Sequence, residues 1–135
     1  MASKLYTLLI GVDKYPTNQL TGCVADSLAW EDYLKQTHND IVWTILRDAQ
    51  ASKANIVRSF RDITKQITPA DRVFIQYAGH GARETAPAAF KHLTTDGKLE
   101  IIMPVDSMNE QGYLTANTLA DKELRYLIWQ MAQKN

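Results

Sequence analysis

Residues 72–81 read Arg-Val-Phe-Ile-Gln-Tyr-Ala-Gly-His-Gly, a largely apolar stretch that ends in a histidine between two glycines. The β-branched and aromatic residues predict a strand over residues 72–77. His80 then follows the carboxyl end of a central strand, where ligands and catalytic groups gather in open α/β sheets. Glycines on both sides let the backbone approach a substrate closely. His80 is therefore a candidate catalytic residue, the alternative being a histidine that caps a strand end in a loop.

Strands and helices alternate on both sides of this stretch. Apolar runs predict three further extended segments: residues 5–10, 41–46 and 99–105. Helical spacing of apolar residues predicts three helices: residues 23–36, 52–67 and 121–131. Ser52 is the expected N-cap of the second helix. Small and polar residues over 83–97 predict a mobile loop.

This order of elements predicts an α/β fold with a mostly parallel sheet and helices on both faces. Three parallel strands leave a long unpaired edge, which is an association hazard. The sequence therefore predicts that the sheet is incomplete in this chain. The missing strand would come from another polypeptide or from a segment that has been removed.

The composition limits the class of protein. The 135 residues suit one domain, and 45% hydrophobic and 22% charged residues are ordinary for a globular protein. Because the formal net charge is zero, no nucleic-acid partner is expected. The apolar run at residues 5–10 is too short for a signal sequence or a membrane span. The lone Cys23 excludes an internal disulfide and suits a reducing, cytoplasmic setting.

Five segments carry recognisable patterns: residues 8–16 (LLIGVD, then YP), 20–27 (LTGCVADS), 51–56 (ASKANI), 74–81 (FIQYAGHG) and 100–106 (EIIMPVD). In this order they resemble the large-subunit region of caspase-like cysteine peptidases, nearest the metacaspase and bacterial branch. The resemblance implies a caspase-like three-layer sandwich. It implies that residues 1–135 form a large-subunit (p20-type) domain that stops before the cysteine-bearing strand.

The resemblance also implies roles for individual residues. His80 matches the catalytic histidine, and the Gly81 N–H matches one oxyanion donor. Asp26 matches the aspartate that lines the pocket for a basic P1 residue, and a carboxylate there accepts a bidentate hydrogen bond from arginine. The alternative for Asp26 is a first-turn carboxylate favoured by the helix dipole. Asp13, in the first matching segment, is a further candidate.

Three departures from the family pattern stand out. Caspase histidines precede their cysteine by about 50 residues, yet residues 81–135 contain no cysteine. A second polypeptide carrying that cysteine and the remaining strands is therefore expected as a partner, beside a protein or peptide substrate. Ala78 replaces the serine of the family's histidine motif, which removes a polar group from the substrate-binding pocket. Leu99 replaces the acidic residue that calcium-dependent members use, so no metal or other cofactor is expected.

Cys23 is itself a candidate nucleophile. It lies at the predicted start of a helix, where the helix dipole would lower the pKa of its thiol. However, it follows the first strand instead of the fourth, and the family has a non-catalytic cysteine at this position. A small buried thiol is the competing interpretation.

Three functional hypotheses follow. The chain is either part of an endopeptidase that cleaves after arginine or lysine, or a non-catalytic caspase-like module that binds or regulates another protein. A nucleotide-binding fold is the third, but residues 11–13 after the first strand lack both glycine-rich phosphate-binding patterns.

Overall fold

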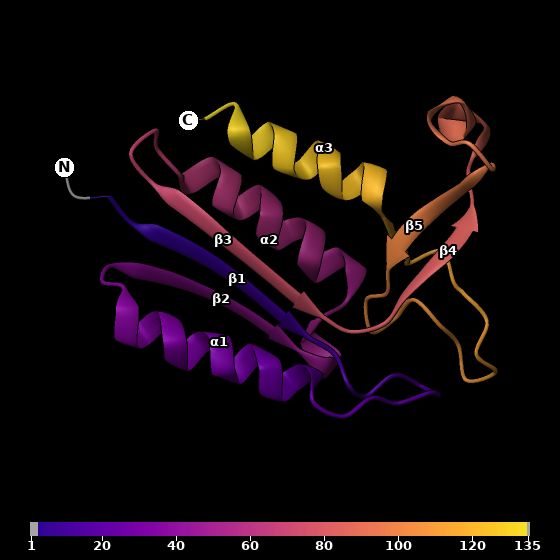
Figure 1. The fold of residues 1–135 in the computed structure, drawn as a ribbon, viewed down its shortest axis with the longest axis horizontal. Helices are drawn as coiled ribbons and strands as arrows, with labels where there is room; N and C mark the ends of the chain where they lie inside the picture. Colours follow the sequence, from indigo (N-terminus) through magenta and orange to yellow (C-terminus); the bar gives the residue numbers. More distant parts are fainter. Residues whose placement is uncertain (1–2, 135) are drawn as a thin grey trace.

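The computed structural model describes residues 3–134 (Figure 1). The strands are β1 (Leu5–Gly11), β2 (Ile41–Arg47), β3 (Arg72–Ala78), β4 (Gly81–Thr85), β5 (Lys98–Ile102) and β6 (Leu119–Ala120). The α-helices are α1 (Cys23–Thr37), α2 (Lys53–Gln66) and α3 (Asp121–Ala132). Two 3-10 helices, η1 (Asp48–Gln50) and η2 (Ala88–Leu93), complete the elements.

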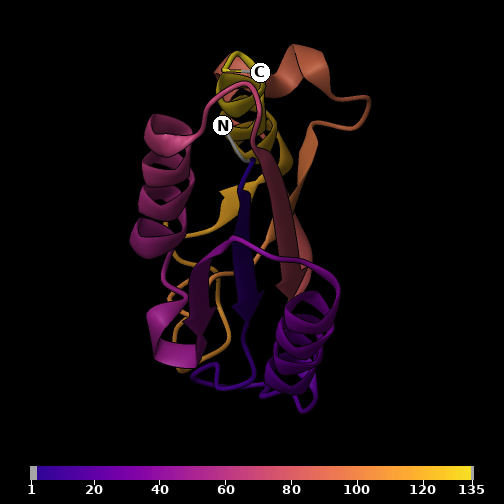
Figure 2. The same ribbon diagram turned by 90° about the vertical axis from the view of Figure 1, so that its left-hand side faces the viewer.

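The first sheet is parallel, with the strand order β2-β1-β3. α1 covers one face, and α2 and α3 lie side by side on the other (Figures 1 and 2). Every residue of the central strand β1 is buried, as expected for a strand covered on both faces. The predicted α/β sandwich with helices on both faces is therefore confirmed.

Successive residues of β1 contribute to different halves of the core. Leu8 and Ile10 pack with Phe60 of α2, whereas Leu9 packs with Leu34 of α1. This alternation is the two-residue period of a strand. The sheet is thereby held between two apolar layers, and its carboxyl edge is left for the loops.

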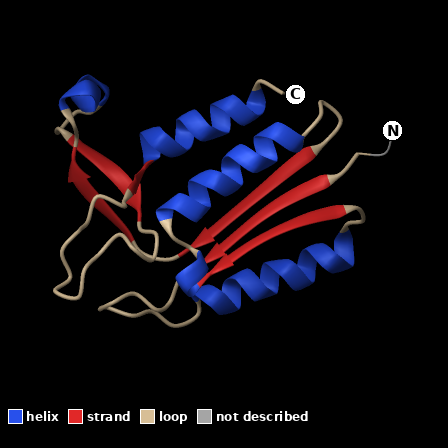
Figure 3. Ribbon diagram, turned by 180° about the vertical axis from the view of Figure 1, so that it is seen from behind, coloured by secondary structure: helices blue, strands red, loops and turns tan. Residues whose placement is uncertain are grey.

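The prediction of a mobile loop over residues 83–97 is wrong for residues 83–85, which belong to β4, and for residues 88–93, which form η2. β4 and β5 form an antiparallel hairpin, and β6 extends it into a second three-stranded sheet (Figure 3). Arg83 in β4 pairs with Asp96 and Glu100. The small and polar residues resemble a loop in composition. However, a strand with one solvated face needs only alternate residues to turn inward, as Ala82 and Glu84 do here.

The edge of β3 is open, since β3 pairs with β1 alone among residues 3–134. Beside it, α1 exposes large apolar side chains that helical spacing alone would place in a core: Leu28, Trp30 and Tyr33. The Trp30 ring lies 5.0 Å from the ring of Phe74 on β3. The unpaired outer edge of β3 thus runs next to an uncovered apolar surface.

Candidate functional site

The candidate site lies at the carboxyl edge of the parallel sheet. Gly11 and Ala78, the last residues of β1 and β3, are direct neighbours in the register. The Ala78 carbonyl accepts the N–H of Val12 at 3.0 Å, which binds the start of the following loop to β3. His80 follows two residues later and is partly exposed. The predicted position of this histidine at a strand tip is correct.

The His80 imidazole has one ring nitrogen engaged. Nε2 lies 2.6 Å from the carbonyl oxygen of Asn18 in the loop after β1. A carbonyl oxygen can only accept, so Nε2 must carry the proton and donate it. In the neutral ring Nδ1 is then the basic nitrogen. No hydrogen bond among residues 3–134 involves Nδ1. The ring is therefore arranged to accept a proton through Nδ1.

Two tyrosine hydroxyls hold the backbone of His80. Tyr15 accepts the His80 N–H at 2.9 Å, and Tyr77 donates to the His80 carbonyl at 2.6 Å. Both phenols also bind the backbone of Met103, just after β5. Neither tyrosine was predicted from the sequence to have a role at this site. The available signal was two tyrosines within the matching segments, but nothing local indicates that their hydroxyls meet.

The N–H of Gly81 points away from the hairpin. The Met103 N–H donates to the His80 carbonyl at 3.0 Å, so these two residues form a hydrogen-bonded pair. Hydrogen-bonded and non-hydrogen-bonded pairs alternate along an antiparallel ladder. The next pair, Gly81 with Ile102, is therefore non-hydrogen-bonded, and the Gly81 N–H is available to an outside acceptor.

Asp26 lies in the first turn of α1, at the same edge as His80. A Cβ on Gly11 would come within 2.8 Å of the Cys23 carbonyl oxygen, so β1 ends in close contact with this turn. The Asp26 side chain is exposed, and no hydrogen bond or ion pair among the described residues engages its carboxylate. Ala78 contributes only an apolar methyl group to this region.

Asp13 is bound to the start of α1. Its carboxylate accepts the N–H groups of Cys23 at 2.9 Å and of Val24 at 3.3 Å. The helix N-cap position is Gly22, which has no side chain for this task. Asp13 therefore satisfies free N–H groups in the first turn from outside the helix.

The expectation that the helix N-terminus lowers the pKa of Cys23 is wrong. Desolvation raises the pKa of the thiol first, and a hydrogen bond to Asp13 and the negative charges of Asp13, Asp26 and Asp48 raise it further. A thiolate would stand among three carboxylates. This disfavours Cys23 as a nucleophile at neutral pH.

Comparison with known proteins identifies the family. The profile described as "Metacaspase, peptidase C14 domain" matches residues 6–133. The chain belongs to this metacaspase family. Metacaspase-1 of Coccidioides immitis is 35% identical over 117 residues, which cover 78% of this chain and 24% of that protein. Metacaspase-1 of Plasmodium falciparum is 32% identical over 133 residues, which cover 90% and 20% respectively.

A crystal structure of a protein from Geobacter sulfurreducens shares the fold. It superposes with a TM-score of 0.71 and 20% identity, over 94% of this chain and 45% of that one. This metacaspase chain spans about a fifth to a quarter of the length of the two curated metacaspases named above. The family is one of cysteine peptidases, which confirms the resemblance seen in the sequence.

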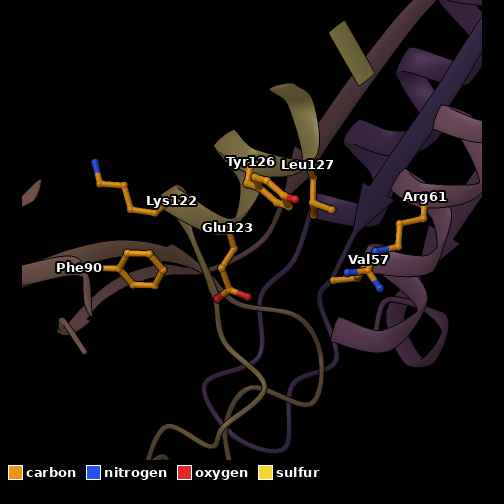
Figure 4. Close-up of a pocket in the computed structure, with 7 residues that line it drawn as sticks. All are labelled: Val57, Arg61, Phe90, Lys122, Glu123, Tyr126 and Leu127. Carbon is orange, nitrogen blue, oxygen red and sulfur yellow. The ribbon is translucent and has the colours of Figure 1, made fainter. Parts of the chain in front are cut away.

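Other regions of this metacaspase chain add nothing to the site. The cavity in Figure 4, of about 300 Å³, lies between α2, α3 and η2 and contains none of the residues above. Within residues 3–134, no group of three His, Cys, Asp or Glu side chains could hold a metal ion. The described helices also include none with the length and apolar character needed to cross a membrane.

Proposed function

We propose that this chain supplies the histidine, one oxyanion donor and the P1 pocket carboxylate of a cysteine endopeptidase that cleaves after arginine or lysine. The observation that carries the proposal is the Nε2 contact of His80 with the Asn18 carbonyl. It leaves Nδ1 as the basic nitrogen, close in the chain to the available N–H of Gly81. A base and a donor at one strand tip are what acyl transfer requires.

In this mechanism Nδ1 of His80 takes the proton of a cysteine thiol. The thiolate attacks the scissile carbonyl carbon, and the Gly81 N–H donates to the oxygen that becomes negative. His80 then returns the proton to the amine, which leaves as the C–N bond breaks. Water, deprotonated by the same imidazole, hydrolyses the thioester and releases the acid and the free thiol. The histidine ends each cycle neutral.

Asp26 supports a basic P1 specificity. Its carboxylate is exposed at the carboxyl edge of the sheet and is not occupied by a partner within the described chain. A guanidinium or ammonium group of a substrate would satisfy it, with arginine favoured because its planar group binds in a bidentate manner. Ala78 adds no polar group of its own to such a pocket.

The nucleophile is assigned to a cysteine on a segment outside these 135 residues, carried by a second polypeptide. The raised pKa of Cys23 argues against its own thiol. The open edge of β3 supports the addition of a strand, because its unpaired backbone groups need hydrogen-bonding partners. A strand there would also bring its flanking segments over Trp30 and Phe74, whose rings lie together beside β3.

The alternative function is a non-catalytic module that binds another protein. The exposed apolar side chains of α1 favour it as well, since uncovered apolar surface marks interaction sites. Binding alone, however, gives no use for a histidine with one fixed and one free nitrogen.

The two functions separate in a cleavage assay. The chain, assembled with a cysteine-bearing polypeptide encoded with it, is given peptides that differ only in P1: arginine, lysine or aspartate. We expect cleavage after arginine and lysine, its loss in His80→Ala, and its persistence in the matched control His92→Ala, an exposed histidine in η2. Binding of the polypeptide without cleavage of any peptide would establish the alternative.

The pocket assignment has a separate test. Asp26→Ala should reduce cleavage after arginine and lysine, whereas Asp32→Ala, an exposed aspartate on the same helix, should leave it unchanged. Equal loss in both variants would refute a specific role for Asp26.

A further inference from the structure

We propose that Tyr15 and Tyr77 are positioning residues that hold the backbone of His80 and thereby present its imidazole in one orientation and one tautomer. The inference deepens the proposed function and rests on it. We call these two side chains the tyrosine pair; their hydroxyls bind main-chain atoms of His80 and Met103. They act on the site through the main chain of the histidine.

The protons of the tyrosine pair can be counted. Each phenol has one proton to donate. Tyr15 donates its proton to the Met103 carbonyl at 2.7 Å and accepts the His80 N–H at 2.9 Å. Tyr77 donates to the His80 carbonyl at 2.6 Å, and its oxygen shares the Met103 N–H, at 3.2 Å, with that same carbonyl, at 3.0 Å. Both polar backbone atoms of His80 are thus bound to phenols that are themselves bound to Met103.

The protonated state of the pair is secure at neutral pH. Burial raises the pKa of both phenols above the ordinary tyrosine value, and for Tyr77 the neighbouring hydroxyl of Tyr15 raises it further. Each hydroxyl therefore keeps the proton that it donates. The arrangement does not change across the pH range in which a histidine works.

Gly79 makes room for the two hydroxyls. A Cβ at this position would lie 2.5 Å from the Tyr77 oxygen and 2.7 Å from the Tyr15 oxygen, closer than real Cβ contacts allow. The glycine before the histidine is therefore explained by the tyrosine pair. The phenol oxygens occupy the space that a side chain at residue 79 would need.

Tyr15 contacts the His80 ring and also belongs to the loop that carries the hydrogen-bond acceptor of that ring. Its ring lies 4.6 Å from the His80 ring, centroid to centroid, at an interplanar angle of 47°. Tyr15 lies in the same loop as Asn18, whose carbonyl oxygen accepts the hydrogen bond from Nε2 of His80. The bond from Tyr15 to Met103 fixes this loop against the end of β5. Tyr15 therefore sets the position of both the ring and its acceptor.

The test is a pair of single-atom deletions. Tyr15→Phe and Tyr77→Phe keep the buried rings and remove only the hydroxyls. In the chain assembled with its cysteine-bearing polypeptide, kcat should fall by up to about 100-fold, the size of effect that a small misplacement of a catalytic group produces. KM should stay unchanged, because the hydroxyls that are removed bind the main chain of His80 and Met103 and act through the histidine.

A second measurement on the same variants does not depend on activity. Two-dimensional NMR of the ¹⁵N-labelled imidazoles should show a single Nε2–H tautomer for His80 in the wild-type chain and a mixture of tautomers in both variants. Tyr6→Phe is the matched control, because Tyr6 is a buried tyrosine near the opposite end of β1. It should keep the single tautomer and the full kcat.

The outcomes distinguish the two proposals. A single unshifted tautomer in both variants would overturn the positioning role, as would equal losses in Tyr6→Phe. Mixed tautomers in the two variants, in a protein that cleaves no peptide in any form, would support the positioning role and overturn the peptidase.

Discussion

The Nε2 atom of His80 lies 2.6 Å from the carbonyl oxygen of Asn18, a residue whose backbone adopts the left-handed conformation with φ of 52°. Asparagine is one of the few residues other than glycine that visit this conformation routinely. The backbone conformation of Asn18 directs its carbonyl to the histidine. A main-chain oxygen therefore selects the imidazole tautomer.

Asn18→Val should destabilise the chain by about 1–2 kcal/mol, because a β-branched residue is strained in the left-handed region. We expect the carbonyl to move and the Nε2–H tautomer of His80 to be lost. Urea unfolding measures the first effect, and imidazole NMR measures the second.

Asn18→Gly is the matched control for this loop. Glycine adopts the same backbone conformation without strain and keeps the carbonyl in place. It should retain the tautomer, since the contact with His80 is made by the backbone. A change in Asn18→Gly as large as that in Asn18→Val would show that the side chain, not the backbone geometry, matters.

Asp13→Asn should change both the stability of α1 and the reactivity of Cys23. Loss of the carboxylate weakens the bonds to the N–H groups of Cys23 and Val24, at a cost of about 1 kcal/mol. It also removes a negative charge that raises the pKa of the thiol.

The thiol of Asp13→Asn should therefore form thiolate at lower pH and react faster with iodoacetamide near pH 8. In the wild-type chain the labelling rate should rise only at higher pH, because the raised pKa keeps the thiol protonated. Equal labelling rates in the two proteins would contradict the effect assigned to Asp13.

Gly79→Ala should destabilise the fold by about 1–3 kcal/mol, the usual cost of overpacking. The added methyl group would meet the hydroxyl oxygens of Tyr15 and Tyr77. Gly81→Ala is the comparison for stability, because its Cβ would meet only the Ile101 carbonyl at 3.4 Å. Chemical unfolding should give a clearly lower free energy of unfolding for Gly79→Ala than for Gly81→Ala. The reverse order would contradict the predicted overpacking at Gly79.

The ion pair between Glu31 and Arg47 should make stability depend on pH. The hydrogen bond from Arg47 and then that from Lys35 lower the pKa of Glu31 in the folded chain. The stabilisation is complete above the ordinary glutamate pKa of about 4.3 and is lost as pH falls through the lowered folded value.

Arg47→Ala should therefore raise the pKa of Glu31 and move the acid-unfolding midpoint to higher pH, as followed by circular dichroism. Lys35→Ala should do so less, because Lys35 is the smaller cause and is more exposed. An unchanged midpoint in Arg47→Ala would show that the ion pair between Glu31 and Arg47 does not contribute to stability at acid pH.

Much of the fold could be predicted because apolar runs, helical spacing and helix caps depend on residues that are close together in the sequence. The apolar run of β1 and the cap of α2 by Ser52, whose hydroxyl accepts the Asn55 N–H at 3.2 Å, both appear as expected. In the hairpin over residues 81–102, the extended segment at β5 was predicted, but β4 was missed because its small and polar residues have loop-like composition. α1 was predicted from apolar spacing, yet Tyr33 is exposed, because spacing cannot tell what covers a helix face.

The sequence by itself determined the alternation of β1, β2 and β3 with α1 and α2, the family and the place of His80 at a strand tip, because periodicity and motifs are local properties. Only the tertiary structure decided which nitrogen of His80 is free, since its Nε2 partner is 62 positions away in the chain. The same holds for the hydroxyls of Tyr15 and Tyr77 and for the carboxylates around Cys23. Hydrogen bonds and charge interactions depend on the distance between atoms in space. These groups come close together only when the loops fold against the edge of the sheet.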